Sequence, residues 1–128
     1  MSHFANLTRR SMLGAISALA VLATASTAFA ADTLKLGFVG VTSGPAAAWG
    51  TSNVRSMQTL ADWYNETGGV KIGDKTYQLE IVTFDDQKDP KRAVEGMEKM
   101  AQEGIHYVVG PNVDDGAAAV RPVAEKNN

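Results

Sequence analysis

An adjacent pair of carboxylates, Asp114 and Asp115, follows the turn-forming residues Gly110 and Pro111 near the end of the chain. Two acids in this setting can meet a ligand that is cationic or donates hydrogen bonds. They can also begin a helix, where carboxylates are favoured at the free amides of the first turn. The sequence leaves both uses open for the pair, and it favours Asp115, beside Gly116, as the helix cap.

A second acidic cluster consists of Asp85, Asp86 and Asp89. It lacks the twelve-residue loop and the closing glutamate of an EF-hand, so it does not match that calcium site. Asp89 precedes Pro90, and a capping carboxylate followed by proline is typical of a helix start. Asp85 and Asp86 end an apolar run. We therefore predict structural roles for all three and no bound metal.

The residues that could support enzymatic catalysis do not form a recognisable set. Ser43 precedes Gly44, but Val41 stands where the first glycine of a GxSxG elbow is required. No GxGxxG or GK[ST] pattern follows the first apolar run, so no nucleotide or other cofactor is predicted. The two histidines, His3 and His106, are far apart in the sequence. The chain is therefore not predicted to be an enzyme.

The first 30 residues have the three regions of a secretory signal peptide. Arg9 and Arg10 supply the positive start, an uncharged apolar stretch follows, and Ala28 and Ala30 are the small residues that precede a cleavage site. Residues 1–30 are thus expected to be removed. The paired arginines fit both the Sec and the twin-arginine export routes, and the sequence does not choose between them.

Composition narrows the class of protein further. The chain has 128 residues, 45% hydrophobic and 20% charged, which is ordinary for a soluble globular domain. It has no cysteine, so it holds neither a disulfide nor a lipid-anchored cysteine. All acidic residues lie beyond residue 30, so removing the signal peptide makes the net charge more negative than −2. No basic surface for nucleic acid is predicted.

Apolar runs and helical spacings alternate along residues 31–128. Near-continuous apolar runs are typical of strands that are covered on both faces, and apolar residues three and four apart indicate helices. This order predicts an α/β three-layer sandwich with a parallel sheet. The expected strands cover residues 34–41, 77–84 and 105–109; helices follow each of them, and the last runs over about 115–126, with Pro122 inside it.

The helix after the first strand has a predicted inner face, and its two tryptophans are treated separately. Trp63 is expected to pack in the core or at a domain edge. Trp49 follows a Ser-Gly-Pro turn, so it can wall a pocket or pack on the start of its own helix. The inward positions are Val54, Met57, Leu60, Ala61 and Tyr64.

A ligand site is expected where the first and third strands end. In open sheets of this order the first strand lies between the second and the third, and ligands bind beyond the carboxyl ends of the strands. The loops over residues 42–50 and 111–116 should therefore meet.

The stretches DTLKLGFVGVTSGPAAAWG, NETGGV and FDDQKDPKRAVEGMEKMAQEGIHYVVGP resemble the periplasmic leucine/isoleucine/valine-binding protein family of ABC transporters. The resemblance covers residues 32–128. It implies a type I periplasmic binding fold, with residues 31–128 as part of the N-terminal lobe and the chain continuing beyond them. It also implies a monomer without cofactors that captures an amino acid or similar small polar solute in the periplasm and delivers it to an ABC permease. A receptor ectodomain of the same fold is the alternative.

The resemblance also implies ligand-binding residues, namely Trp49, Asn112, Val113 and Asp114, with Asp115 beside them. Asp114 stands where amino-acid binders place a serine that holds the ligand's α-carboxylate. A carboxylate there removes a donor and repels such a ligand. One hypothesis is therefore a neutral or amine-bearing solute in place of leucine, isoleucine or valine. The alternative is that Asp114 turns away as a helix cap while the amides of the third helix hold an anion.

Overall fold

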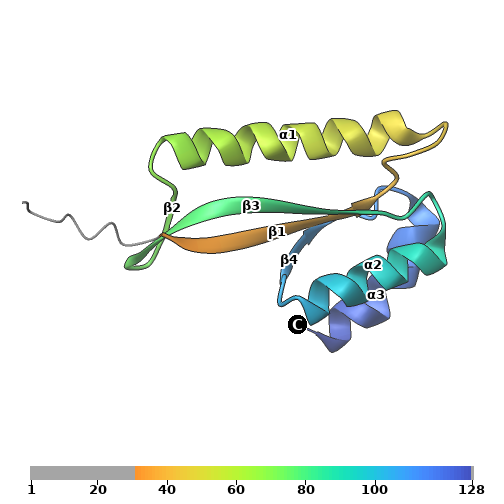
Figure 1. The fold of residues 1–128 in the computed structure, drawn as a ribbon. Coiled ribbons are helices and arrows are strands. Elements are labelled where there is room, and N and C mark those ends of the chain that lie inside the picture. Colours follow the sequence, from red (N-terminus) through yellow and green to blue (C-terminus); the bar gives the residue numbers. More distant parts are fainter. Residues whose placement is uncertain (1–30, 128) are drawn as a thin grey trace, which may run out of the picture.

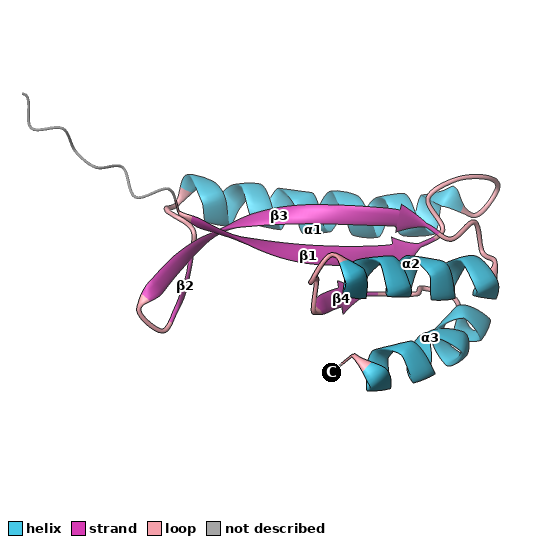
Figure 2. Ribbon diagram, turned by 60° about the horizontal axis from the view of Figure 1, so that its bottom comes forward, coloured by secondary structure: helices cyan, strands magenta, loops and turns pink. Residues whose placement is uncertain are grey.

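The computed structural model describes residues 31–127, and the predicted signal peptide lies outside them. Helix α1 covers one face of a sheet, while α2 and α3 cover the other (Figure 1; Figure 2). The predicted three-layer α/β sandwich is confirmed. In chain order the elements are β1 (Asp32–Gly40), α1 (Ala47–Glu66), β2 (Val70–Ile72), β3 (Lys75–Asp85), α2 (Pro90–Gln102), β4 (Tyr107–Val109) and α3 (Asp114–Lys126). No helix within residues 31–127 is both long and apolar enough to cross a bilayer.

The sheet has the strand order β2-β3-β1-β4. β1 pairs in parallel with β3 and with β4, so the predicted central place of the first strand is confirmed. β2 is antiparallel to β3 across the turn at Gly73, whose φ is 61°, so the sheet is mixed at this edge. The register joins Gly40 to Asp85, and the two strands therefore end side by side.

The main core lies between the sheet and the pair α2 and α3. Its buried members are Val39, Ala93, Met100, Ile105 and Val120. Ala93 and Met100 lie seven residues apart in α2, two turns of one helix face.

Helix α1 contacts the sheet with a narrower face than predicted. Ala61 is buried, and the Asn65 amide group bonds both the N–H and the C=O of Leu79, which fixes the end of α1 to β3. Leu60, expected inward, is 56% exposed, and Trp63 is 55% exposed. Leu60 lies about 100° around the helix from Ala61, beyond the line that meets the sheet. Tyr64, also expected inward, is 36% exposed, so the inward predictions for Leu60 and Tyr64 and the core alternative for Trp63 are wrong.

Two boundaries also differ from the prediction. α1 begins at Ala47, so Trp49 and Gly50 belong to its first turn and not to the preceding loop. β4 covers only Tyr107–Val109, and Ile105 is buried ahead of the strand.

Candidate ligand-binding site

Three loops meet at the carboxyl end of β1. The Val41 amide donates to the Oδ1 atom of Asn112 at 3.2 Å, and the Thr42 amide donates to Oδ1 of Asp85 at 2.8 Å. Asn112 follows β4 and Asp85 ends β3, so side chains from both neighbouring strands hold successive amides of the central chain. The expected meeting of the loops after β1 and β4 is seen here, and the loop after β3 joins them.

Two glycines permit this close approach. A Cβ atom at Gly50 would lie 1.9 Å from the carbonyl oxygen of Val41, so α1 can begin against the end of β1 only because Gly50 has no side chain. A Cβ atom at Gly40 would lie 2.7 Å from Oδ1 of Asn112 and from the ring of Phe38. The site is therefore built on tight backbone contacts.

Asp85 is ionised, and its carboxylate accepts several hydrogen bonds. Desolvation by burial opposes its charge, but hydrogen bonds from the Ser43 side chain and from the Thr42 and Gln87 backbone outweigh it and lower the pKa of Asp85 to about 2. The Gln87 amide lies 3.1 Å from Oδ1. Hydrogen bonds to the charged form are the physical cause of this low pKa.

The stability of the protein should depend on this carboxylate at acid pH. Because the pKa of Asp85 falls from 3.8 to about 2 on folding, its contribution is complete above pH 3.8 and is lost as the pH falls through about 2. After allowance for solvent screening we expect about 1 to 2 kcal/mol. Denaturant unfolding of wild-type protein and the Asp85→Asn variant, from neutral pH down to about pH 2, should show their stability difference shrinking across this window.

Asp86 contributes with the opposite sign. Burial raises the pKa of Asp86, so its stabilising contribution is present below pH 3.8 and is lost as the pH rises through the raised pKa. Comparing the two proteins cancels the part of this effect that comes from burial and leaves the smaller part that comes from the charge of Asp85. A stability difference that stays constant over the window would contradict the assignment to Asp85.

The other members of the acidic cluster have structural partners. Asp86 is 1% exposed and accepts a hydrogen bond from the Lys88 amide at 2.8 Å. Asp89 accepts from the Lys91 amide at 2.8 Å, and its predicted role as the cap of α2 is confirmed. Across residues 31–127 no group of three or more His, Cys, Asp or Glu side chains is arranged to hold a metal ion.

The pair Asp114 and Asp115 occupies the first turn of α3. The cap position belongs to Val113, whose side chain offers no hydrogen bond, so the predictions of Asp115 or Asp114 as the cap are wrong. Gly116 is buried and packs against Pro111, where an added Cβ would lie 3.1 Å from the proline side chain. Both carboxylates are exposed, and both lie at the positive end of the helix.

The remaining predicted residues divide between the two faces of the sheet. Trp49 is 60% exposed, so it does not pack on its own helix start as a buried indole would. Its helix α1 and the helix α3 of Asp114 begin at the same end of the sheet, on opposite faces (Figure 1). The Oδ1 atom of Asn112 accepts the hydrogen bond from the Val41 amide, while its Nδ2 atom is buried without a partner among the described residues. Val113 is half-buried.

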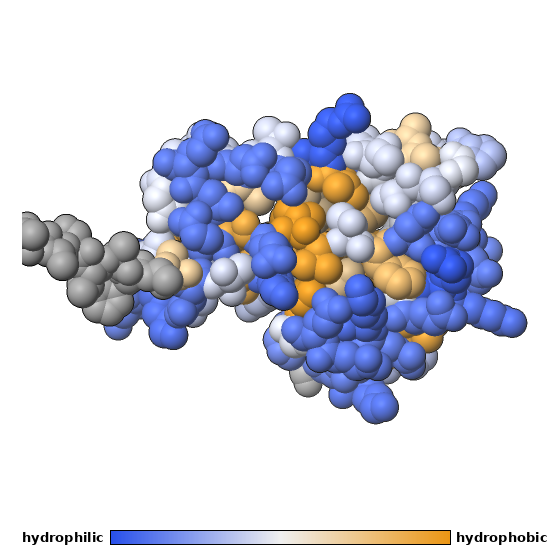
Figure 3. Space-filling view, in the orientation of Figure 1, coloured by the Kyte–Doolittle hydropathy of each residue, from blue (hydrophilic) through white to orange (hydrophobic). Residues whose placement is uncertain are grey.

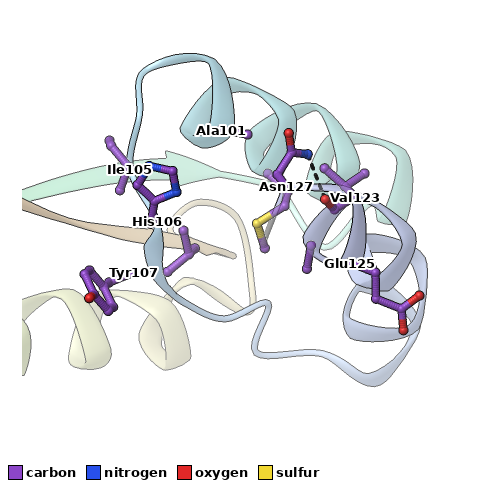
Figure 4. A pocket seen from close by; sticks show the side chains of 10 residues that line it. Ala101, Ile105, His106, Tyr107, Val123, Glu125 and Asn127 are labelled. Carbon is purple, nitrogen blue, oxygen red and sulfur yellow. Dashed lines mark hydrogen bonds between the residues drawn. The ribbon is translucent and has the colours of Figure 1, made fainter.

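A hollow of about 620 Å³ lies elsewhere, between α2, α3 and the amino end of β4 (Figure 4). Ile105, His106 and Tyr107 line one side, and Val123 and Asn127 line the other. The sequence patterns do not predict this hollow. The feature that could have indicated the hollow is the position of β4. It is the last strand in the sheet order, and one of its edges is unpaired within the described residues.

An apolar area also lies on the α1 side of the sheet. Tyr107 is 63% and Val109 is 51% exposed, and they pair with Leu36 and Phe38 of β1. Figure 3 shows apolar atoms gathered below α1 in this region. Neither this area nor the hollow contains the predicted ligand residues.

Comparisons with known proteins place the chain among solute-binding proteins. A family described as periplasmic binding protein matches residues 33–128. The leucine-specific-binding protein of Salmonella typhimurium is 38% identical over 101 residues, which is 79% of this chain and 25% of that protein. The leucine-, isoleucine-, valine-, threonine- and alanine-binding protein of Pseudomonas aeruginosa is 36% identical over 94 residues, 73% of this chain and 24% of that protein.

Solved structures agree with these relatives. The branched-chain amino acid transporter substrate binding protein LivJ from Streptococcus pneumoniae, in complex with isoleucine, matches with a TM-score of 0.66 and 32% identity. The match covers 75% of this chain and 27% of that structure. A type 1 periplasmic binding protein from Bordetella pertussis matches with a TM-score of 0.63 and 27% identity over 75% of this chain and 25% of its own. The chain thus spans about a quarter of the length of these relatives.

Proposed function

The chain belongs to the periplasmic leucine/isoleucine/valine-binding protein family, and from this membership we propose that it captures a small polar solute, an amino acid or a close analogue, for an ABC importer. The family consists of solute-binding proteins and not of enzymes. Residues 31–128 would supply part of the N-terminal lobe. The solute would be held between this lobe and a second one in the periplasm, and the closed monomer would deliver it to a membrane permease.

The observation that carries this proposal is the similarity to amino-acid-binding relatives over most of the described chain. The arrangement of the loops supports it. The loops after β1 and β4 come together at the carboxyl end of the sheet, which is where ligands bind in open α/β sheets. Trp49 is exposed there and its indole is free to pack on a solute.

We assign the selectivity of the site to Asp114. This residue begins α3 beside amides that have no side-chain cap, so a ligand carboxylate would gain the amides but meet the negative charge. A neutral or amine-bearing head group would avoid the repulsion. The proposed solute is therefore an amide or an amine-bearing relative of an amino acid, with a free amino acid as the weaker ligand.

Calorimetry of the full-length mature protein tests the proposal. The panel contains L-leucine, L-isoleucine, L-valine and the corresponding amides. We expect saturable binding of at least one amide, about tenfold tighter than the matching free amino acid. Tight binding of L-leucine would contradict the selectivity but support solute binding. No binding of any panel member would contradict the proposed solute class.

A further inference from the structure

The side chain of Asp85 holds a segment that the backbone ladder does not reach. The parallel pairing of β1 and β3 ends at Gly40 and Asp85, and the Asp86 amide then donates to the Gly40 carbonyl at 3.1 Å. Beyond this point, no backbone hydrogen bond joins residues 42–46 to β3 or β4 within the described chain. The Asp85 carboxylate bridges the gap by accepting from the Thr42 amide at 2.8 Å.

Asp85 is itself fixed from several directions. Its Oδ1 atom also accepts a hydrogen bond from the Gln87 amide at 3.1 Å. Its backbone carbonyl accepts a hydrogen bond from Nη2 of Arg92 at 3.1 Å. Because these contacts hold Asp85 in place, the position of Asp85 restrains the segment at Thr42 to which it is hydrogen-bonded.

The segment leads directly to the exposed tryptophan. After Ser43, Gly44 takes a φ of 70°, its carbonyl accepts from the Ala47 amide at 3.1 Å, and α1 begins. Only six residues separate Thr42 from Trp49. A shift at Thr42 therefore moves the start of α1 and the indole with it.

We propose that Asp85 is a positioning residue of the ligand site, because its hydrogen bond to the Thr42 amide sets the place of Trp49 without touching the solute. The proposal rests on the proposed function, since it assigns Trp49 to the solute. It goes beyond a strand-end role for Asp85. Water alone could hydrate a carboxylate that did no more than end a strand. The Asp85 carboxylate instead accepts hydrogen bonds from the backbone amides of two segments, at Thr42 and at Gln87.

The experiment compares three variants of the full-length mature protein, Asp85→Ala, Asp85→Asn and Asp89→Ala. Asp89→Ala is the matched control, because it also removes a carboxylate that accepts from a backbone amide at 2.8 Å, but it caps α2 and does not contact residues 42–46. Asp85→Asn keeps an oxygen for the Thr42 amide. Amide hydrogen exchange without ligand and calorimetry with L-isoleucine and L-isoleucinamide are the two readouts.

For Asp85→Ala we expect exchange at the Thr42 and Ala47 amides, the hydrogen-bonded amides of this segment and of its junction with α1, to accelerate by about tenfold, and affinity for the bound panel member to fall by about fivefold. Asp89→Ala should stay within about twofold of wild type in both readouts, and Asp85→Asn, which keeps one acceptor oxygen but loses the charge, should fall between wild type and Asp85→Ala. Unchanged exchange at these two amides in Asp85→Ala overturns the proposal, and so does faster exchange with unchanged affinity. If wild-type protein binds neither probe, the proposed solute class fails, and the exchange arm alone decides whether Asp85 holds the segment.

Discussion

The Asp114→Ser variant should bind L-leucine and L-isoleucine at least about fivefold more tightly than the wild-type protein, a gain of about 1 to 4 kcal/mol. The substitution removes a negative charge from the first turn of α3 and adds a hydroxyl donor beside amides that have no side-chain cap. Both changes favour a ligand carboxylate. Affinity for a matching amide should change little or fall. Calorimetry of both proteins with a free amino acid and with its amide measures whether the preference between the two ligands is reversed.

Glu125→Gln is the control for bulk charge in this comparison. It removes one negative charge from the same helix, but about 16 Å away along its axis, beyond the screening length at physiological salt. It should leave both affinities unchanged within about twofold. If Asp114→Ser and Glu125→Gln alter leucine binding equally, Asp114 has no direct role in the selectivity of the site.

The Gly50→Ala variant should be destabilised by about 3 kcal/mol. An alanine inside a helix normally stabilises it relative to glycine by about 1 kcal/mol, so the expected sign is reversed. The reason is that the added Cβ would lie 1.9 Å from the carbonyl oxygen of Val41, a backbone atom that cannot rotate away. Helix α1 would have to lift from the end of β1.

Denaturant unfolding of the full-length mature protein measures this effect, with Asn53→Ala as the control. Asn53 is an exposed residue of the same helix, and its replacement should change stability by no more than about 0.5 kcal/mol. A Gly50→Ala protein as stable as the control would mean that α1 does not contact β1 at this point.

The sequence was sufficient to predict elements whose signals are local. The apolar run that became β1 and the proline after Asp89 each identified an element, and the order of the elements predicted the layers. Asp89 was recognisable as a cap because capping depends on neighbours two residues away.

The residues that were misplaced or missed depend on distant parts of the chain. Leu60 has helical spacing, but its exposure depends on how far the sheet extends beneath α1. Asp115 has the chemistry of a cap, yet α3 begins at Asp114 with Val113 in the cap position. The bond from Thr42 to Asp85 spans 43 residues, and no local pattern encodes it.

The long helix α1 carries one tryptophan near each end. Trp49 and Trp63 are 14 positions apart, about 21 Å along the axis, and both rings are more than half exposed. Trp63 meets the ring of Tyr64 edge to face, with 4.9 Å between the ring centroids, at the end away from the ligand loops. The fluorescence of the two indoles therefore reports on opposite ends of α1. Replacing Trp63 by phenylalanine leaves Trp49 as the one indole of residues 31–127, an intrinsic optical reporter at the proposed ligand site.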